Sequence, residues 1–366
     1  MRKYFLDNIR YFTIIVVVLF HIIYMYNGQS VPVVIGAFHE NQIQDVFQYI
    51  VYPWIMILLY IISGISSYLY LRKNNNYFYD RTIKLLVPST IGLLVFGWVL
   101  GYYNMLINGS FSKIPKTINK FILYIIMSLA GVGTLWFNQV LWINSVLLIL
   151  IRKFEKNKIY IFMSNISLNP FYVLVIGFGL LASSRILNTP IVLYRFGVFG
   201  YAFFIGYFIF SKENNINYLE RNYIFFLILS FVFGVAYTCR YYGENYSLHE
   251  IFGSLLSIGY AWFSCLAIIG IGKKYFDKKY TFTEFMSKKS YGIYVFHYLC
   301  LTSTGYYLRK YTNLYPFIQY IIVGLSCFVG SILLFEIMSR IPIIRWCVLG
   351  LTNKAKQNVN LNLKQK

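Results

Sequence analysis

Charged residues are scarce in this sequence of 366 residues, and their scarcity excludes most classes of soluble protein. Charged side chains make up only 12% of the chain, while 58% of its residues are hydrophobic and 20% are aromatic. Soluble domains carry about 25% charged residues and about 45 to 50% apolar ones. The mean hydropathy of +0.58 therefore indicates a chain that lies in a lipid bilayer.

Acidic residues are the scarcest of the charged types. The chain has 12 Asp and Glu against 33 Lys and Arg, which gives a formal net charge of +21. A basic face of clustered charges would favour nucleic-acid binding, but here the charges are spread over the segments between apolar runs. Such segments face the anionic inner leaflet of a membrane. We therefore expect the lipid bilayer as a partner and no nucleic acid.

Paired cysteines are also missing. The five cysteines lie within or at the edges of apolar runs, with no spacing typical of a metal site, a redox pair or a disulfide framework. We expect no metal site and no tightly bound cofactor. A signal-peptide cleavage site is likewise missing after the first apolar run, which is too long for a signal-peptide core, so we expect this run to remain as a span.

Ten apolar segments are long enough to cross a bilayer, which takes about 20 mostly apolar residues per helix. The segment 121–135 is also apolar and is left open as a further span, a re-entrant piece or an interfacial helix. The ten predicted spans are 8–27, 46–71, 85–107, 134–151, 167–186, 195–211, 222–240, 250–272, 290–308 and 317–339.

The basic residues orient these spans. With the N-terminus inside, 25 of the 33 Lys and Arg residues fall in inner segments, as cytoplasmic loops require. The sequence thus predicts an all-α, polytopic integral protein of the cell membrane, with about ten transmembrane helices and both termini cytoplasmic. Residues 1–350 would form a single transmembrane domain, and 351–366 a polar cytoplasmic tail.

The first span carries three ionisable residues on one face. At about 100° per residue, Asp7, Arg10 and His21 lie within about 60° of one another, and His21 lies about 16 Å deeper than Arg10. Ionisable residues inside a membrane are costly and point to function. The alternative is an interfacial ion pair of Asp7 with Arg10 and a structural hydrogen bond from His21 to a neighbouring helix.

Two further clusters lie near the predicted inner surface and in the ninth span. Arg81 and Lys84 stand three residues apart before the third span and could hold an anion with several phosphates; positive-inside anchoring is the alternative. Ser290, Tyr294 and His297 project from one side of the ninth span, either as a site or as structural hydrogen-bonding groups.

The motif GTLWFNQVLW, residues 133–142, opens the fourth span. Trp136 could belong to the interfacial aromatic belt. Asn138 is less expected there, and its amide could hydrogen-bond a polar substrate. We therefore count Trp136, Asn138, Tyr294 and His297 as candidate substrate-binding residues.

In order along the chain, YFLDNIRYFTIIVVVLFH, DRTIKLLVP, GTLWF and SYGIYVFH resemble the membrane-bound acyltransferase 3 family. Its members move acyl groups onto cell-envelope carbohydrates, and GTLWF and RTIKLLVP are similar to the subset that resembles the glucans biosynthesis protein C. The resemblance implies a cytoplasmic acyl-CoA donor, acetyl-CoA or succinyl-CoA, and a cell-envelope glycan acceptor.

The resemblance also implies roles for residues of this chain. His21 matches the first-span His that is central to transfer, and Arg10 matches the family's first-span Arg. Arg81 and Lys84 match a basic pair near the donor that is more usually two arginines. His21 would act as a general base on a sugar hydroxyl or would carry the acyl group itself, and the sequence does not separate these roles. A transporter that exports a polysaccharide or a sugar-containing lipid is the alternative.

Overall fold

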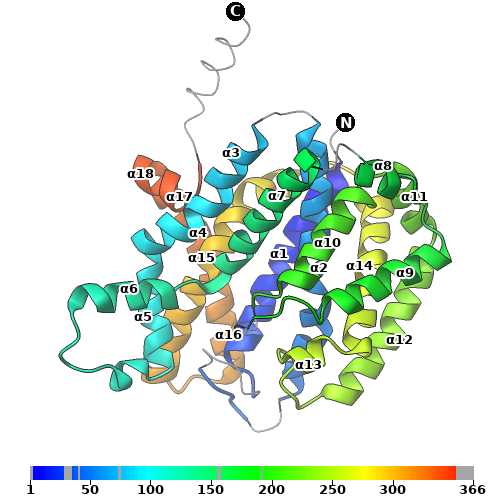
Figure 1. Ribbon diagram of the computed structural model, residues 1–366. Coiled ribbons are helices and arrows are strands. Elements are labelled where there is room, and N and C mark those ends of the chain that lie inside the picture. Colours follow the sequence, from blue (N-terminus) through cyan, green and yellow to red (C-terminus); the bar gives the residue numbers. More distant parts are fainter. Residues whose placement is uncertain are drawn as a thin grey trace, which may run out of the picture.

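The computed structural model describes residues 3–28, 35–39, 42–72, 76–154, 158–189, 191 and 193–351. These residues form a helical bundle without a β-strand (Figure 1). Among them, Asn188 and Arg195 form an isolated antiparallel β-bridge. The predicted all-α class is confirmed. The predicted tail 351–366 lies outside the described residues except for Leu351.

Seven helical segments of the described chain are long and apolar enough to cross a membrane. Each coincides with one of the ten predicted spans, so the chain has the character of a multi-pass membrane protein. The segments are α1 (Tyr4–Met25), η1 (Ile43–Asp45) with α2 (Val46–Leu71), Tyr77–Ile107, η5 (Gly133–Leu135) with α7 (Trp136–Phe154), α12 (Tyr223–Tyr241), α14 (Leu255–Phe276) and Pro316–Arg340.

Two of these segments are helices interrupted by π-helical turns, whose wider turn shifts the side chains that follow. The chain also has five short helices beside the longer ones: η4 (Ser110–Lys113), α8 (Lys158–Ser164), α11 (Glu213–Arg221), α13 (His249–Phe252) and α18 (Pro342–Cys347). The interrupted segments are α3 (Tyr77–Arg81), η2 (Thr82–Leu86), α4 (Val87–Gly92), η3 (Leu93–Gly97) and α5 (Trp98–Ile107), and then α16 (Pro316–Leu325), η6 (Ser326–Gly330) and α17 (Ser331–Arg340).

The other three predicted spans also fall on helices. α9 (Pro170–Ser183) and α10 (Phe196–Phe208) are apolar but short, with 14 and 13 residues. α15 (Thr281–Tyr311) has 31 residues, but it is too rich in Ser, Thr and Tyr to count among the seven. The number of ten spans and the cytoplasmic side of both termini therefore stay predictions. The start of α1 and α18 do lie at the same end of the bundle (Figure 1).

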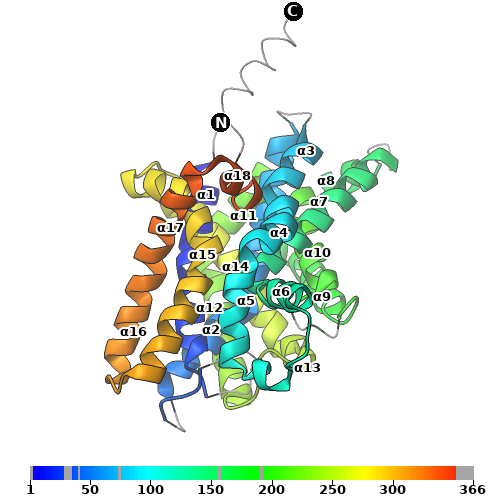
Figure 2. The ribbon, with the colours of Figure 1, turned by 90° about the vertical axis from the view of Figure 1, so that its left-hand side faces the viewer.

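The segment 121–135, whose path the sequence did not decide, contains most of α6 (Lys120–Ala130), which lies across α5 (Figure 2). Its 11 residues reach about 16 Å, too little to cross a hydrocarbon core of about 30 Å. Glycines permit the crossing: a Cβ on Gly101 would lie 1.7 Å from the carbonyl oxygen of Met127, and one on Gly131 would lie 1.9 Å from that of Gly97. α6 is therefore a short helix packed on α5 and not a span.

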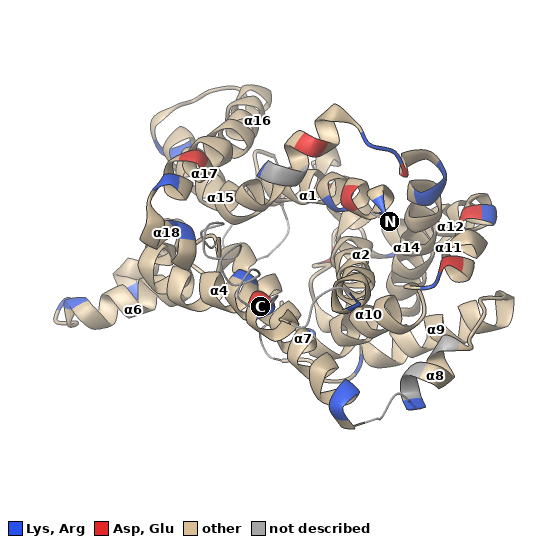
Figure 3. Cartoon of the chain, turned by 90° about the horizontal axis from the view of Figure 1, so that it is seen from above, with Lys and Arg blue, Asp and Glu red and all other residues tan. Residues whose placement is uncertain are grey.

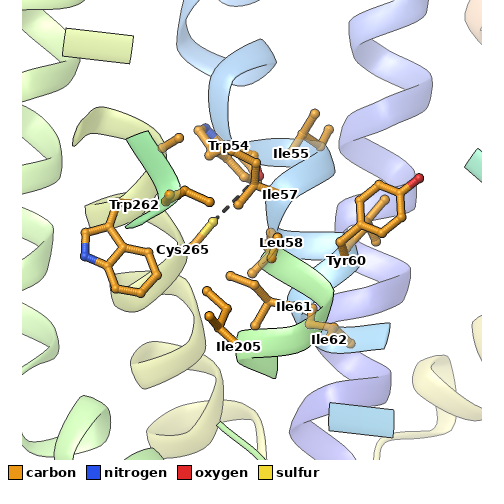
Figure 4. Packing of buried hydrophobic residues seen from close by; sticks show 14 of the residues in the cluster. Trp54, Ile55, Ile57, Leu58, Tyr60, Ile61, Ile62, Ile205, Trp262 and Cys265 are labelled. Carbon is orange, nitrogen blue, oxygen red and sulfur yellow. Dashed lines mark hydrogen bonds between the residues drawn. The ribbon is translucent and has the colours of Figure 1, made fainter. Parts of the chain in front are cut away.

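The core is centred on α2, which packs on α10 and α14 (Figure 4). Ile57, Leu58 and Ile61 of α2 are fully buried, and the Cys265 thiol of α14 donates to the carbonyl oxygen of Trp54 at 3.7 Å. Membrane helices associate through close van der Waals packing where small residues let backbones approach. A Cβ on Gly206 of α10 would lie 2.2 Å from the Ile61 carbonyl oxygen, so α2 and α10 touch along their backbones.

This contact predicts different results for two glycines of α10. We expect Gly206→Ala to lower the thermal unfolding temperature by several degrees, because a backbone carbonyl cannot yield to the new Cβ. Gly200→Ala is the matched control: its Cβ would lie 3.4 Å from the Asn144 side-chain oxygen, and Ala gains about 1 kcal/mol of helix propensity over Gly. Equal unfolding temperatures for the two variants in detergent would contradict this packing.

Charged residues gather at the end of the bundle where α1 begins and α2 ends (Figure 3). The last turns of α7, α14 and α17 carry basic residues there. Glu213 of α11 accepts from Lys3 at 2.6 Å and lies 3.1 Å from Lys273, and Lys3 above all holds the pKa of this carboxyl below its ordinary value. We call this the basic end; the positive-inside bias predicts that it faces the cytoplasm.

Candidate active site

Arg10 of α1 is held between its own helix and α2. One guanidinium nitrogen, Nη1, lies 3.3 Å from Oδ1 of Asp7, and Nη2 donates to the Ser66 hydroxyl at 2.8 Å. The Ser66 hydroxyl in turn donates to the Ile62 carbonyl oxygen one turn earlier. The ion pair of Asp7 with Arg10, which belongs to the alternative, structural interpretation of this face, is formed, and a serine of α2 adds a second contact that sets the direction of the guanidinium.

Arg81 is held by the neighbouring serine. Its Nη2 donates to the Ser67 hydroxyl at 2.9 Å, and the Tyr77 hydroxyl donates to the same oxygen at 2.9 Å. The guanidinium carbon also lies 5.1 Å from the centre of the Tyr77 ring, within the range of a cation–π contact. Two adjacent serines of α2 therefore fix two arginines that come from different helices.

Lys84 lies in the π-helical turn η2, directly after α3. Such turns are frequent at functional sites. The backbone carbonyl of Lys84 accepts from the Tyr291 hydroxyl of α15 at 3.3 Å, and the Trp142 indole of α7 donates to Thr82 at 3.1 Å. Contacts with α7 and α15 thus position the turn that carries Lys84.

A cavity of about 330 Å³ lies among α1, α2, α3, α7 and α15, toward the basic end. Three cations line it together with one carboxylate, Asp80, which accepts a hydrogen bond from the Tyr70 hydroxyl. Its charge is therefore net positive. The lining residues are Arg10, Ile14, Leu59, Ser63, Ser66, Tyr70, Asp80, Arg81, Lys84, Leu85, Phe137, Asn138, Leu141, Ser290, Tyr291 and Tyr294.

The end of the cavity that reaches deepest into the bundle is less charged. Tyr294 lines it, and reciprocal bonds with Thr134 tie α15 to η5: the Tyr294 hydroxyl donates to the Thr134 carbonyl, and the Thr134 hydroxyl donates to the Tyr294 carbonyl at 3.1 Å. Asn138 is only 2% exposed, yet it lines the cavity, and its amide lies beside the hydroxyl of Tyr291, which also lines it. The amide and this hydroxyl together offer hydrogen-bonding groups to a polar group inside the cavity.

One helical turn beyond Tyr294, two imidazoles meet. Nε2 of His297 lies 3.2 Å from Nδ1 of His21, and the ring centres are 5.2 Å apart. His297 is fully buried, and its Nδ1 lies 2.8 Å from the Ile293 carbonyl oxygen. The Tyr298 ring lies nearly perpendicular to the His21 ring, with the ring centres 5.1 Å apart. The cavity thus leads from three cations toward a pair of histidines from α1 and α15.

A family model described as an acyltransferase domain matches residues 3–336 of the chain, which is nearly its whole length. The chain belongs to the acyltransferase 3 family. No curated protein and no solved structure matches it. The resemblance seen in the sequence motifs is therefore confirmed, and the seven long apolar helices together with the family make this a membrane acyltransferase.

Five of the predicted site residues of this acyltransferase line one cavity: Arg10, Arg81, Lys84, Asn138 and Tyr294. Asp7 does not line the cavity, but it forms an ion pair with Arg10, which does. His21 and His297, predicted separately as a transfer residue and a substrate-binding residue, contact each other instead.

Trp136 lies elsewhere. Its ring packs 5.6 Å from that of Phe199, it is 8% exposed, and it does not line the cavity. Among the described residues, no group of three or more His, Cys, Asp or Glu side chains is placed to hold a metal ion. The polar groups that the structure brings together here are the three cations, the Asn138 amide and the two imidazoles.

Proposed function

We propose that this acyltransferase moves a short acyl group, acetyl or succinyl, from a cytoplasmic acyl-CoA to a hydroxyl group of a cell-envelope carbohydrate. One observation carries the proposal: a single cavity joins three cations at the basic end to the region one turn from the His21–His297 pair. The donor requires such a site, because coenzyme A has its phosphates at one end and its thioester at the end of a long arm.

The basic end of the cavity fits the nucleotide part of the donor. The Arg81 guanidinium can hold a phosphate with two parallel hydrogen bonds, and the Lys84 ammonium adds a second charge without fixed direction. A volume of about 330 Å³ is small for a whole acyl-CoA. We therefore propose that the nucleotide sits at the mouth, and that only the arm and the acyl group enter the cavity toward His21.

His21 then performs the transfer. A neutral imidazole accepts the proton of the sugar hydroxyl, the oxygen attacks the thioester carbonyl, and the C–S bond breaks as the tetrahedral intermediate collapses. The protonated imidazole returns the proton to the coenzyme A thiolate. In the alternative path, His21 itself attacks the carbonyl and holds the acyl group before the sugar arrives. Both paths need a free ring nitrogen on His21.

Donor binding can be tested without the acceptor. We expect acetyl-CoA at about 100 times its Kd to stabilise the detergent-solubilised protein by about 2.7 kcal/mol, which raises its thermal unfolding temperature. Acetyl-pantetheine, which lacks the nucleotide phosphates, is the matched ligand and should stabilise far less at the same concentration. A protein that only exports a polysaccharide would respond to neither, and that outcome would overturn the proposed donor.

A further inference from the structure

The hydrogen bonds of His297 determine which ring nitrogen of each histidine carries a proton. Nδ1 of His297 faces the Ile293 carbonyl oxygen at 2.8 Å. A carbonyl only accepts, so this nitrogen carries a proton. In a neutral imidazole the other nitrogen is then bare, and Nε2 of His297 is an acceptor. Its partner at 3.2 Å, Nδ1 of His21, must therefore be the donor.

The surroundings of the pair favour this neutral arrangement. His297 is fully buried, and among the described residues no carboxylate acts on either ring. A charge resting on the pair would be uncompensated in an apolar setting.

We propose that His297 is a positioning residue that holds His21 in the Nδ1–H tautomer and so presents Nε2 of His21, bare, to the reacting groups. The inference rests on the proposed acyl transfer and names the nitrogen that performs it. It also gives His297 a different role from the substrate contact predicted from the sequence. The hydrogen bond to His297 uses Nδ1 of His21, so it leaves Nε2 of this ring for a substrate.

The same contact supports His21 during the reaction. When Nε2 takes up the hydroxyl proton, the Nδ1–H group donates from a charged ring, and hydrogen bonds from charged donors are roughly twice as strong as neutral ones. His297 is held firmly enough for this task. Its Nδ1 is tied to Ile293, and its carbonyl oxygen accepts from the Cys327 thiol of η6 at 3.7 Å. The acceptor is thus in place before the proton arrives.

Two substitutions of similar size separate positioning from packing. In His297→Gln, the amide oxygen can stand where Nε2 stands and accept from His21, whereas His297→Leu fills the space but offers no acceptor. We expect His297→Leu to lower kcat by about 10- to 100-fold, because the ring of His21 loses a hydrogen bond that it makes while it is charged, with an unchanged KM for acetyl-CoA. His297→Gln should recover most of this loss. The assay is the steady-state transfer of labelled acetyl groups by purified protein in lipid vesicles.

Each result is informative. Equal kcat values for the two variants, or a loss confined to KM, would overturn the positioning role. If both variants unfold at a lower temperature than wild type but still differ in kcat, the proposal stands, because packing alone would affect them alike. A wild-type protein that transfers no acyl group would instead refute the proposed function, and an active His21→Ala variant would refute its assignment to His21.

Discussion

Replacing His21 with alanine should lower kcat for acyl transfer by about 10³-fold, within the range of about 10² to 10⁴ that a positioned general base supplies. The Ala side chain can neither accept the hydroxyl proton nor attack the thioester. The KM for acetyl-CoA should change little, because His21 does not line the cavity that holds the three cations. Steady-state transfer of labelled acetyl groups in lipid vesicles measures both constants.

His249 provides the control for this substitution. Its Nε2 lies 3.0 Å from the Thr189 carbonyl oxygen, on a short helix outside the cavity. His249→Ala should retain nearly full activity. Thermal unfolding of both variants separates lost chemistry from lost structure. A folded His21→Ala variant with wild-type kcat would show that the imidazole of α1 has no part in transfer.

Replacing Arg81 with alanine should raise the KM for acetyl-CoA by about 10- to 100-fold, since a hydrogen bond to a charged group contributes about 1.5 to 3 kcal/mol. The value of kcat at saturating donor should stay near that of wild type, because the guanidinium lies at the basic end and not at the imidazole pair. Arg81→Lys should give an intermediate KM for acetyl-CoA, because Lys keeps the positive charge but cannot make two parallel hydrogen bonds to one phosphate. Initial rates over a range of acetyl-CoA concentrations give both constants.

A cation outside the cavity is the control for Arg81. Lys153 lies in the last turn of α7, at the same end of the bundle, but does not line the cavity. Lys153→Ala removes one positive charge from the same surface and should leave KM unchanged. If Lys153→Ala raises the KM for acetyl-CoA as much as Arg81→Ala does, the effect comes from the overall positive charge of the basic end, and the phosphate site is wrongly placed.

The helical periodicity of α1 was enough to predict part of the site. Asp7, Arg10 and His21 belong to one helix, so their shared face follows from local geometry alone, and the ion pair of Asp7 with Arg10 is present. The cavity also joins Arg81 and Lys84, the predicted basic pair, to Arg10 and Asn138, and the role of the pair near the donor stays a prediction.

The contacts between helices could not be predicted in this way. Sequence spacing says nothing about which helix faces which, so the pairing of His21 with His297 was missed although both residues were singled out. The serines of α2 were missed for another reason. A serine in an apolar helix usually bonds the carbonyl four residues earlier, as Ser66 does with Ile62, so its second bond to Arg10 leaves no trace in the sequence.

Hydropathy alone could not decide how one apolar run lies. Residues 121–135 were left open as a span, a re-entrant piece or an interfacial helix, and the glycine contacts of α5 with α6 show a short helix packed across its neighbour. In the motif GTLWF, the aromatic Trp136 attracted attention as a substrate contact, yet it packs on Phe199. Asn138, two residues further along the same helix, lines the cavity, because residues two positions apart in a helix point in directions about 200° apart.

The proposed function places the acyl-CoA donor on the cytoplasmic side and the glycan acceptor on the outer side, so transfer across a sealed bilayer tests it most directly. Acetyl-CoA labelled in its acetyl group is enclosed in vesicles with the protein's basic end inward, and a soluble envelope glycan is supplied only outside. The account predicts that label appears on the outer glycan, with one free thiol of coenzyme A released inside for each acetyl group transferred, and that His21→Ala abolishes both. Label that stays inside with intact acetyl-CoA, or glycan that crosses the bilayer unmodified, would contradict it.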